Sequence, residues 1–430
     1  MADLEEALAW LEGHVNMEAD RSPSAADLRL GKVAELAKLS GDPQHAAPVV
    51  HVTGTNGKGS TTALLTDLLG AHGLTVGTYT SPDLERINER LARNGEPIRD
   101  DELAEVLDDL RTLEEGSGVR ATRFELLTLA AFRWFADLPV DVMVVEVGLG
   151  GARDATNIAD AAVAVVTNVG LDHVGVIGPT RVDIAREKAG IVKPGSTLVL
   201  GETDPELVPL FEAAGGARTV RRGPDLDVDR NTLAVGGRAL DLRTPEGRYE
   251  DVFLSLHGAH QGDNAVLAVA ATEAFFGRPI DDEVVRQVLA TASVPGRFEV
   301  VGRSPLVILD GAHNPDGARA AAATLGDFSV DGETILVVGM SAERDPVEML
   351  TALGAPAARL VVATAAATPR AMAAEDVAAA ARTVGVEAVV VPEVGEAVRR
   401  AIGRAGPNDV VLVTGSLYIA GEARRAQARR

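Results

Sequence analysis

Cysteine is absent from the 430 residues, which excludes disulfides, thiolate nucleophiles and cysteine-based zinc sites. Aromatic residues make up only 3% of the chain. There is no uninterrupted apolar run of about 18 residues, so we expect no membrane-spanning helix. The first residues, MADLEEALAWLEGHV, are acidic and lack the basic and then apolar layout of a secretory signal. We therefore expect a cytoplasmic protein.

Basic side chains are also scarce. The chain has 41 Lys and Arg against 63 Asp and Glu, which gives a formal net charge of −22. Such a surface repels nucleic-acid phosphates and anionic lipid, so we expect neither nucleic acid nor a membrane as a partner. Lysine is the rarer base, and its scarcity gives some weight to each of its positions: Lys32, Lys38, Lys58, Lys188 and Lys193.

Short β-branched runs alternate with longer stretches rich in Ala, Leu and Glu, the pattern of βα units around a parallel sheet. A chain of 430 residues is also too long for one compact core. We predict an α/β protein with a doubly wound, P-loop ATPase-like domain over residues 1–292 and a smaller Rossmann-like α/β domain over residues 299–430. Short alternating segments predict a small antiparallel elaboration at residues 217–257. The stretch SVPGR predicts a linker over residues 293–298.

A glycine-rich loop, GTNGKGS at residues 54–60, lies between an expected strand at 48–52 and an expected helix at 58–72. Glycines let backbone N–H groups point at a polyphosphate, the helix N-terminus adds partial positive charge, and Lys58 adds a full one. Ser60 is placed to offer its hydroxyl to Mg²⁺. The spacing between the outer glycines is shorter than in the usual phosphate loop. The alternative is a glycine-rich turn without a ligand, but the loop favours ATP binding.

Three polar side chains follow other expected strands. Glu146 closes the run at 140–147, His173 follows the run at 163–168, and Ser81 follows the run ending at residue 79. Carboxyl ends of parallel strands form the edge where open α/β sheets bind ligands, and oxygen and imidazole groups suit a divalent metal. Taken singly, each has another explanation: an exposed charge, a hydrogen-bonded loop residue and a helix cap. Their coincidence at one edge favours a metal site.

Ten segments together resemble the dihydrofolate synthase/folylpolyglutamate synthase family of the Mur ligase superfamily. In chain order they are VVHVTGTNGKGSTTALL, TSPDLERINERLARNGEPI, TRFELLTLAAF, VVEVGLGGARDATNI, TNVGLDHVGVIG, IAREKAGIVKPG, GAHQGDNA, VPGRFEVV, VILDGAHNPDGA and VLVTGSLYIAGEAR. The resemblance runs from about residue 25 to residue 424. It is far more specific than the phosphate loop alone.

The resemblance implies an ATP-dependent amide ligase. In this family ATP phosphorylates a carboxylate of the acceptor, and the amine of L-glutamate attacks the resulting acyl phosphate. The implied acceptor is 7,8-dihydropteroate, the γ-carboxylate of a tetrahydrofolate, or both. The partners would then be small molecules, and because no interface stripe stands out in the sequence we expect a monomer.

The resemblance also assigns roles by position. It implies that the ATP phosphates are held by Asn56, Gly57, Lys58 and Gly59, and that Asn264, Arg297 and Asp310 contact the nucleotide. It implies metal ligands at Ser60, Ser81, Glu146, His173 and Lys188, with two Mg²⁺ ions and Lys188 carried as a carbamate. The implied catalytic residues are Lys58, Lys188, His173 and His313.

For the acceptor, the resemblance implies a pocket formed by Asp27, Leu28, Arg29, Thr122, Arg123, Phe124, Glu125, Arg153, Asp154 and Ala155. Phe124 could stack on a pterin and Asp154 could accept from its amino group. The alternative for Phe124 is a core position on the helix expected from residue 122 to residue 135.

Two positions depart from the family pattern near the metal or the acceptor. Asp83 stands where the family usually has histidine after Ser-Pro, and Ala152 precedes Arg153 where the arginine usually follows the glycine pair directly. Two rival hypotheses stay open, and these departures together with the low aromatic content motivate the first of them. One is a related ligase that acts on a different carboxylate acceptor, and the other is a non-catalytic nucleotide-binding regulator.

Overall fold

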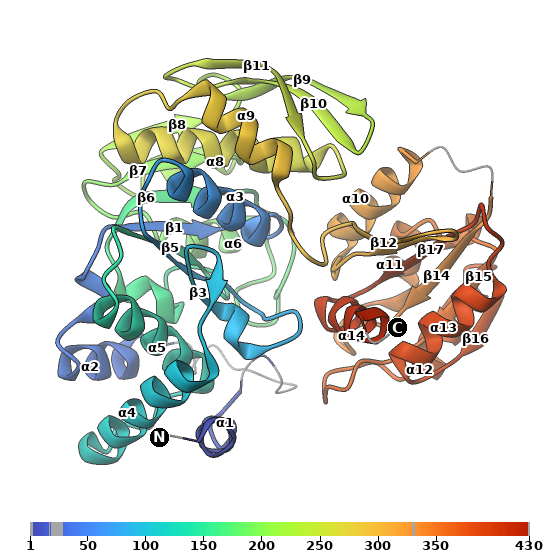
Figure 1. The fold of residues 1–430 in the computed structure, drawn as a ribbon, viewed down its shortest axis with the longest axis horizontal. Coiled ribbons are helices and arrows are strands. Elements are labelled where there is room, and N and C mark those ends of the chain that lie inside the picture. Colours follow the sequence, from blue (N-terminus) through green and yellow to red (C-terminus); the bar gives the residue numbers. More distant parts are fainter. Residues whose placement is uncertain (1–2, 17, 19–28, 329–331, 429–430) are drawn as a thin grey trace.

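The computed structural model describes residues 3–16, 18, 29–328 and 332–428. The chain forms two lobes that face each other, a larger N-terminal lobe and a smaller C-terminal lobe (Figure 1). Both are α/β layers, so the predicted fold class is confirmed. None of the helices in the described residues is long and apolar enough to cross a membrane.

A twisted sheet forms the centre of the N-terminal lobe. Within the described residues it has eight strands in the order β4-β3-β2-β5-β1-β6-β7-β8, parallel from β2 to β8. The bounds are β1 (Val49–Thr53), β2 (Val76–Tyr79), β3 (Leu91–Arg93), β4 (Glu96–Pro97), β5 (Val142–Glu146), β6 (Ala161–Val166), β7 (Thr197–Leu200) and β8 (Arg218–Arg221). The buried runs of β1 and β5 are continuous because helices cover both sheet faces.

Side chains alternate between the two faces, so each face has its own core. Val50 and Val52 pack on the side of α3 (Lys58–Ala71), α8 (His260–Phe276) and α9 (Asp282–Thr291). Val49 packs on the other side, in a core shared with α1 (Leu4–Glu12), α2 (Gly31–Leu39), α4 (Asp100–Ser117) and α5 (Arg123–Asp137). Beside β6 and β7 lie α6 (Arg181–Ala189) and α7 (Val208–Glu212). Short 3₁₀ turns are η1 (Pro43–His45), η2 (Ile87–Arg90) and η3 (Ala155–Ile158).

A small antiparallel sheet lies above α8 and α9 in Figure 1. It consists of β9 (Asp227–Ala234), β10 (Gly237–Arg243) and β11 (Arg248–Leu254). The expected elaboration at 217–257 was therefore too long at its start, because residues 218–221 form β8 and pair in parallel with β7. This edge strand is only half-buried, and its polar alternation resembles that of an exposed hairpin strand.

The C-terminal lobe holds a second sheet. In the described part of the chain its order is β12-β13-β17-β14-β15-β16, with β12 the antiparallel edge strand. The strand bounds are β12 (Glu299–Arg303), β13 (Leu306–Leu309), β14 (Thr334–Val338), β15 (Leu360–Ala363), β16 (Ala388–Val390) and β17 (Val410–Thr414). The helices are α10 (Pro315–Gly326), α11 (Pro346–Ala352), η4 (Ala355–Ala357), α12 (Ala374–Thr383), α13 (Val394–Arg404) and α14 (Leu417–Ala428).

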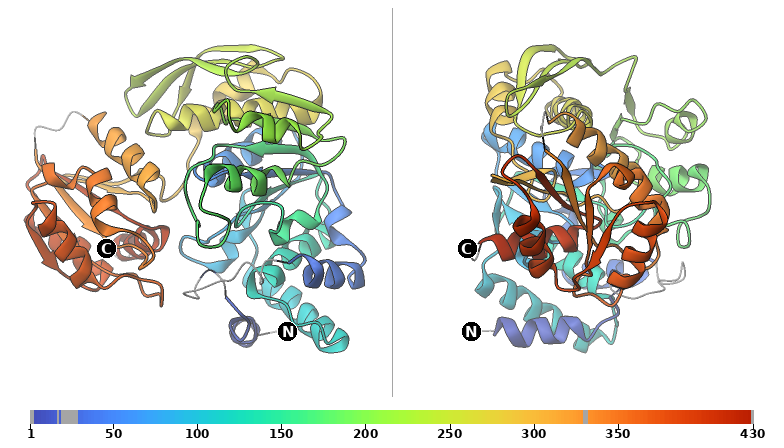
Figure 2. Two further views of the ribbon diagram at one scale, coloured as in Figure 1. Left: turned by 180° about the vertical axis from the view of Figure 1, so that it is seen from behind. Right: turned by 90° about the vertical axis from the view of Figure 1, so that its right-hand side faces the viewer.

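The two lobes are joined by residues 292–298, which follow α9 and precede β12 (Figure 2). Phe298 ends this segment with a left-handed φ of 50° and is 2% exposed. Its ring lies 6.3 Å from that of His257 and 5.5 Å from that of Phe328, between the two lobes. This packing fixes where Arg297, the preceding residue, enters the space between the sheets.

Candidate active site

The loop from Gly54 to Gly57 joins β1 to α3 and has the conformation that a phosphate-binding loop needs. Gly57 is the N-cap of α3 with φ of 85°, a value that favours glycine. A β-carbon there would also lie 2.3 Å from Oδ1 of Asn264. Gly57, Lys58, Gly59 and Asn264 line one cavity, so the N-terminus of α3 borders that cavity beside the Asn264 amide.

The end of β6 holds this loop in place. The backbone N–H of Asn56 donates to Oδ1 of Asn168 (3.0 Å), and the Thr167 hydroxyl donates to the carbonyl of Asn56 (2.6 Å). Lys58 folds back over the loop, where its Nζ donates to the carbonyls of Gly54 (3.1 Å) and Thr55 (3.4 Å). Its ammonium thus lies within the loop, at the place where phosphates would bind.

Glu146 is a carboxylate at the end of β5 that is only 4% exposed. Its Oε2 accepts a hydrogen bond from the Ser81 backbone (3.3 Å). A β-carbon on Gly59 would lie 3.7 Å from Oε2 of Glu146 and 3.9 Å from Nη2 of Arg297, so these groups share one small space. Burial raises the pKa of Glu146, while the charges of Lys58 and Arg297 work against that rise.

The donor set at this point fits a divalent cation. Ser60 is 3% exposed in the first turn of α3, and Ser81 follows β2, so hydroxyl and carboxylate oxygens come from three strand ends. Hard oxygen ligands of this kind are the ones that Mg²⁺ prefers. The described residues contain no cluster of three or more His, Cys, Asp or Glu side chains that could hold a metal. A site here would therefore combine Glu146 with serine hydroxyls and with oxygens of the bound substrates.

His173 and Lys188 are two nitrogen bases whose pKa values are lowered by burial in the same region. His173 lies in the loop after β6 with a left-handed φ of 51°, and burial lowers its pKa to about 4. Lys188 lies near the end of α6 and is 3% exposed; burial, with help from Lys58, lowers its pKa to about 7. Among the described residues, no side chain pairs with the Lys188 ammonium. A buried amine of this kind is unusual for a surface helix, and favours a functional role.

The acceptor side of the site has one aromatic wall. Phe124 is half-buried in the first turn of α5, its ring 6.1 Å from that of Tyr79. It also packs against the chain at Gly148, just after β5. Half-burial leaves one part of the ring facing the site, so Phe124 is both a packing residue and a wall.

Several residues predicted to contact the acceptor already have structural partners. Asp154 caps η3, where it accepts from the Thr156 backbone (3.0 Å) and from the Leu149 backbone (2.8 Å). Thr122 and Glu125 form a reciprocal capping box that starts α5. Arg153 donates to Glu187 (3.0 Å). These side chains already make hydrogen bonds within the protein that hold the pocket wall in place. A ligand that contacts them would have to share those hydrogen bonds or replace them.

The other acceptor-side predictions divide into three outcomes. Arg123 pairs with Glu18 (3.3 Å) and does not line the cavity. Arg29 does line it, whereas Asp27 and Leu28 lie outside the described residues.

Asp83, the first departure from the family pattern, forms an ion pair with a buried arginine. Its Oδ1 accepts from Nε of Arg90 (2.6 Å), and Arg90 is 2% exposed. The same guanidinium donates to both carboxylate oxygens of Glu18 (3.1 and 2.8 Å). Burial alone would raise the pKa of Asp83, but the charge and hydrogen bonds of Arg90 outweigh it and lower the pKa. Asp83 therefore neutralises Arg90 in the loop that follows Ser81.

The C-terminal lobe contributes groups from the loop after β13. Asp310 accepts from the backbone N–H groups of Phe298 (3.0 Å) and Ala312 (2.9 Å), which ties the linker to that loop. His313 follows, with Nδ1 at 3.1 Å from the carbonyl of Gly311. The Arg297 guanidinium lies between this loop and Gly59, because a β-carbon on Gly311 would be 3.2 Å from its Nη1.

Most of the predicted site residues surround one cavity of about 1070 Å³ between the lobes. The predicted residues that line it are Arg29, Asn56, Gly57, Lys58, Gly59, Ser60, Ser81, Thr122, Phe124, Glu125, Glu146, Arg153, Asp154, Ala155, His173, Asn264, Arg297, Asp310 and His313. Lys188 lies behind the lining, next to Gly151. A volume of this size suits a nucleotide together with a second substrate.

Sequence reasoning missed five polar residues at the site: Thr167, Asn168, Asp172, Asn314 and Arg344. Burial alone would raise the pKa of Asp172, but His313, His173 and Arg344 outweigh it and hold the pKa well below its usual range. Asn168 and Asp172 belong to the segment TNVGLDH, which follows an expected strand and also contains His173, so their position at the sheet edge could have indicated them. Arg344 is in no motif or strand end that would have indicated it.

A phosphate loop on a parallel sheet, faced across a cavity by groups of a second α/β domain, is the arrangement of an ATP-dependent Mur ligase. The model of the Mur ligase middle domain matches residues 52–272, and that of the Mur ligase glutamate ligase domain matches residues 296–417. The Mycobacterium tuberculosis dihydrofolate synthase/folylpolyglutamate synthase is 39% identical over 382 residues, covering 83% of this chain and 78% of that relative. The Bacillus subtilis protein of the same name is 33% identical over 432 residues, covering 98% of each. The chain belongs to the dihydrofolate synthase/folylpolyglutamate synthase family.

Solved structures agree with this assignment. The Mycobacterium tuberculosis folylpolyglutamate synthase complexed with ADP superposes with a TM-score of 0.91 at 33% identity, covering 100% of this chain and 99% of that one. A bifunctional folylpolyglutamate synthase/dihydrofolate synthase with Mn, AMPPNP and L-glutamate bound gives 0.86 at 31% identity, covering 100% and 98%. Nucleotide and divalent metal are thus ligands of this family.

Proposed function

We propose that this chain joins L-glutamate to 7,8-dihydropteroate, to the γ-carboxylate of a tetrahydrofolate, or to both, with hydrolysis of ATP to ADP and phosphate. The observation that carries the proposal is the convergence on one cavity of the phosphate loop, the buried Glu146, Arg297 from the linker and His313 from the other lobe. Neither lobe holds all of these groups, so the reaction requires both.

The chemistry begins with a poor electrophile. A carboxylate oxygen of the acceptor attacks the γ-phosphorus of ATP, ADP leaves, and the acceptor becomes an acyl phosphate. The amine of L-glutamate then attacks the acyl carbon, phosphate leaves with the bonding electrons, and the amine loses a proton as the amide forms. Such a sequence depends mainly on positioning and on charge stabilisation.

Side chains of this chain can supply both needs. Asn56, Gly57, Lys58 and Gly59 would hold the phosphates through backbone N–H groups and the Lys58 ammonium, which would leave its two carbonyl partners. Arg297 would contact the phosphates from the linker, and Asn264 would contact the nucleotide beside Gly57. Asp310 would act indirectly, by holding the linker and the His313 loop in place.

Ser60, Ser81, Glu146 and His173 would hold a divalent cation, which when bound offsets phosphate charge and polarises the phosphoryl group. We further propose a second ion near Lys188. An amine with a pKa of about 7 is about half uncharged at pH 7, and the uncharged form is the one that reacts with CO₂ to give a carbamate. The added carboxylate would turn a buried base into an oxygen ligand.

The acceptor would lie against Phe124, near Arg29, Arg153 and Ala155, with its carboxylate toward Glu146. Asp27 and Leu28 complete the proposed set. The residues of each lobe come from one chain, so we propose that the monomer is active and that residues 1–292 and 299–430 act as its two domains.

The test is a mass-spectrometric product assay with ATP, Mg²⁺ and L-glutamate, in which dihydropteroate and tetrahydrofolate are offered separately. We expect addition of a glutamyl residue to at least one of them, and its loss in Lys58→Met. A result with neither acceptor, together with glutamate-dependent ADP formation on another carboxylate, would favour the rival ligase motivated by Asp83 and Arg153. Absence of ADP with every acceptor would favour a non-catalytic regulator.

A further inference from the structure

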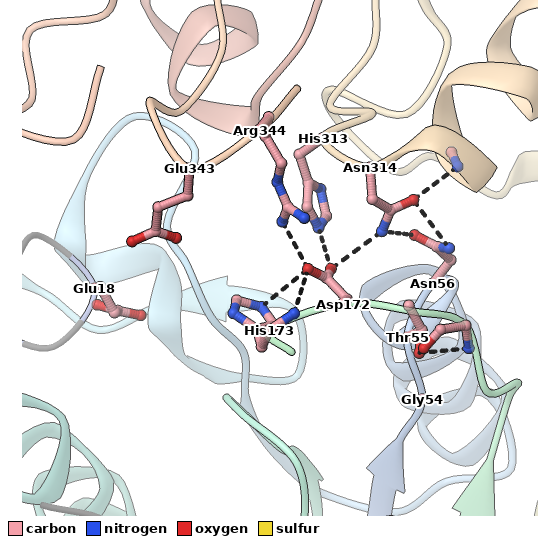
Figure 3. A network of polar contacts seen from close by, with 12 residues as sticks. Glu18, Gly54, Thr55, Asn56, Asp172, His173, His313, Asn314, Glu343 and Arg344 are labelled. Atoms are coloured by element: carbon pink, nitrogen blue, oxygen red, sulfur yellow. Dashed lines mark hydrogen bonds and ion pairs between the residues drawn. The ribbon is translucent and has the colours of Figure 1, made fainter. Parts of the chain in front are cut away.

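Asp172 lies in the N-terminal lobe but is held mainly by the C-terminal lobe. It follows β6 in the loop that carries His173, and it is 6% exposed. Its Oδ1 accepts from Nη2 of Arg344 (2.6 Å), and its Oδ2 accepts from Nδ2 of Asn314 (3.2 Å) and lies 3.5 Å from Nε2 of His313 (Figure 3). One carboxylate therefore meets three side chains from the opposite lobe.

The contacts continue from Asn314 to the phosphate loop. Nδ2 of Asn314 donates to Oδ1 of Asn56 (3.0 Å), and Nδ2 of Asn56 is 3.4 Å from Oδ1 of Asn314 (Figure 3). Asn314 is 1% exposed and is the N-cap of α10, where its Oδ1 accepts from the Gly317 backbone (2.8 Å). Movement of α10 relative to the N-terminal lobe would thus break or shift the hydrogen bonds that Asn314 makes with Asn56. We call Asp172, Asn56, His313, Asn314 and Arg344 the Asp172 network.

Among the described residues, the other hydrogen bonds and ion pairs between the lobes do not involve the phosphate loop. Arg238 on β10 pairs with Asp327 (2.8 Å) at the end of α10. Arg424 on α14 pairs with Glu85 of the N-terminal lobe. These pairs can hold the lobes near each other, but neither touches a residue that would contact ATP.

A buried carboxylate costs free energy unless donors compensate for its lost water. If the C-terminal lobe moved away, Asp172 would lose Arg344, Asn314 and His313 together and would need water instead. Burial of the Asp172 carboxylate is therefore favourable only when the lobes are docked and all three side chains contact it. At the same time the docked lobe positions Asn56 through Asn314.

We propose that Asp172 is a positioning residue that locks the two lobes together and thereby sets the phosphate loop for the reaction. The inference rests on the proposed function, because a ligase whose groups come from both lobes needs the lobes docked during turnover. Asp172 does not itself touch the substrates. It acts through Arg344 and Asn314.

The absence of cysteine allows a direct test of docking. Glu105 on α4 and Arg400 on α13 are exposed and lie on different lobes, so Glu105→Cys and Arg400→Cys give a single pair of sites for fluorescent labels. Energy transfer is measured in the full chain with Mg²⁺ and AMPPNP, which needs no turnover. Asp172→Asn and Arg344→Gln are compared with Arg359→Gln, a control whose partners Glu333 and Asp409 lie within the C-terminal lobe.

We expect Asp172→Asn and Arg344→Gln each to lower the docked fraction and to reduce kcat by about tenfold or more, with less than about a threefold change in KM for ATP. The double variant should lose little more than either single variant, because both remove the same interaction. Arg359→Gln should match the parent in both measurements.

Parent-like energy transfer and kcat in Arg344→Gln would overturn the proposal, and an effect of Asp172→Asn alone would then mean that Asp172 only orients His173. If Asp172→Asn does not fold, Arg344→Gln decides the question by itself. A chain that shows docking but makes no glutamylated product would contradict the proposed function and leave this inference standing.

Discussion

The ring of Phe124 occupies the space that a side chain at Gly148 would need. A β-carbon at position 148 would lie 2.4 Å from Cζ of Phe124 and 2.8 Å from Cε2. The backbone of Gly148 does not have a positive φ, so the ring, rather than the local conformation, is what requires glycine here. Gly148 lies two residues after Glu146, which ends β5. The Phe124 ring that would form the acceptor wall therefore packs next to the proposed metal site.

Gly148→Ala should displace the Phe124 ring while the backbone stays in place. We expect KM for the pterin acceptor to rise by about tenfold and KM for ATP to change little, because a misplaced stacking wall affects only acceptor binding. Gly116→Ala on α4 is the control, since no atom lies within 4 Å of a β-carbon there. Steady-state kinetics decide the matter, and an unchanged acceptor KM would show that Phe124 does not contact the acceptor.

Glu146→Gln should separate stability from activity. Burial disfavours the charged form of Glu146, so the neutral amide should leave the free energy of unfolding equal or higher. Activity should fall by about 100-fold or more, because a neutral amide is a weak ligand for a divalent cation. Urea unfolding and kcat are the measurements.

The control for this variant is Glu273→Gln, another carboxylate that is 1% exposed and whose pKa is also raised by burial. It accepts from Tyr249 (2.6 Å), and neither residue lines the cavity. It should keep its kcat. A similar loss of kcat in both variants would contradict a specific role for Glu146.

The sequence allowed the buried strands and their ends to be located, because each apolar run stops at a turn rich in glycine or polar residues. That was enough to place Ser81, Glu146 and His173 at one sheet edge. It was not enough to foresee the partners of Asp83 and Asp172. Arg90 is seven residues beyond Asp83, and Arg344 is 172 residues from Asp172, so both pairings depend on how loops and lobes pack.

Some residues predicted to contact a ligand have a structural role instead, which the sequence alone could not show. Asp154 and Thr122 sit in motifs that indicate ligand contact, yet each caps a helical turn. A short polar side chain before a helix satisfies backbone N–H groups whether or not a ligand is near. For Lys188, burial decides between a surface position near a helix end and a functional amine. Burial depends on how the folded chain packs, so the sequence alone does not show it.

Lys188 should make the stability of the protein depend on pH between 7 and 10.5, the pKa values of its folded and ordinary states. Below about pH 7 the amine is protonated in both states, and burying its charge carries the full cost. Between these values the unfolded chain holds more protons than the folded one, so stability rises with pH by up to about 1.4 kcal/mol per unit. Above pH 10.5 the cost is gone.

Lys188→Met removes this dependence. We expect the variant to be more stable than the parent at pH 7, and the difference to shrink steadily toward pH 10. Urea unfolding in CO₂-free buffer without metal measures the difference. Lys38→Met, at an exposed position, should give a difference that does not change with pH. A flat difference for Lys188→Met would mean that its amine keeps its ordinary pKa.

Arg90 should be a major source of stability for the loop that follows Ser81. Arg90→Leu would leave the Asp83 carboxylate without the guanidinium that neutralises it, and Glu18 with its pair to Arg123 (3.3 Å) alone. Removing one partner of a buried ion pair costs about 3–5 kcal/mol, and the partial exposure of the two acids places the expected loss near the lower end, about 3 kcal/mol. Asp83→His, which restores the usual family residue, should also destabilise because it sets a second base beside Arg90.

The control is Arg99→Leu, since the Arg99–Asp101 pair is exposed on both sides and should change the free energy of unfolding by less than about 1 kcal/mol. The double variant Arg90→Leu with Asp83→Leu should recover part of the loss, because it removes the carboxylate that Arg90→Leu leaves without an arginine partner. Urea unfolding measures all four variants. If Arg90→Leu were no less stable than Arg99→Leu, Asp83 would be free for another role, and the departure from the family pattern at this position would again bear on the metal or the acceptor.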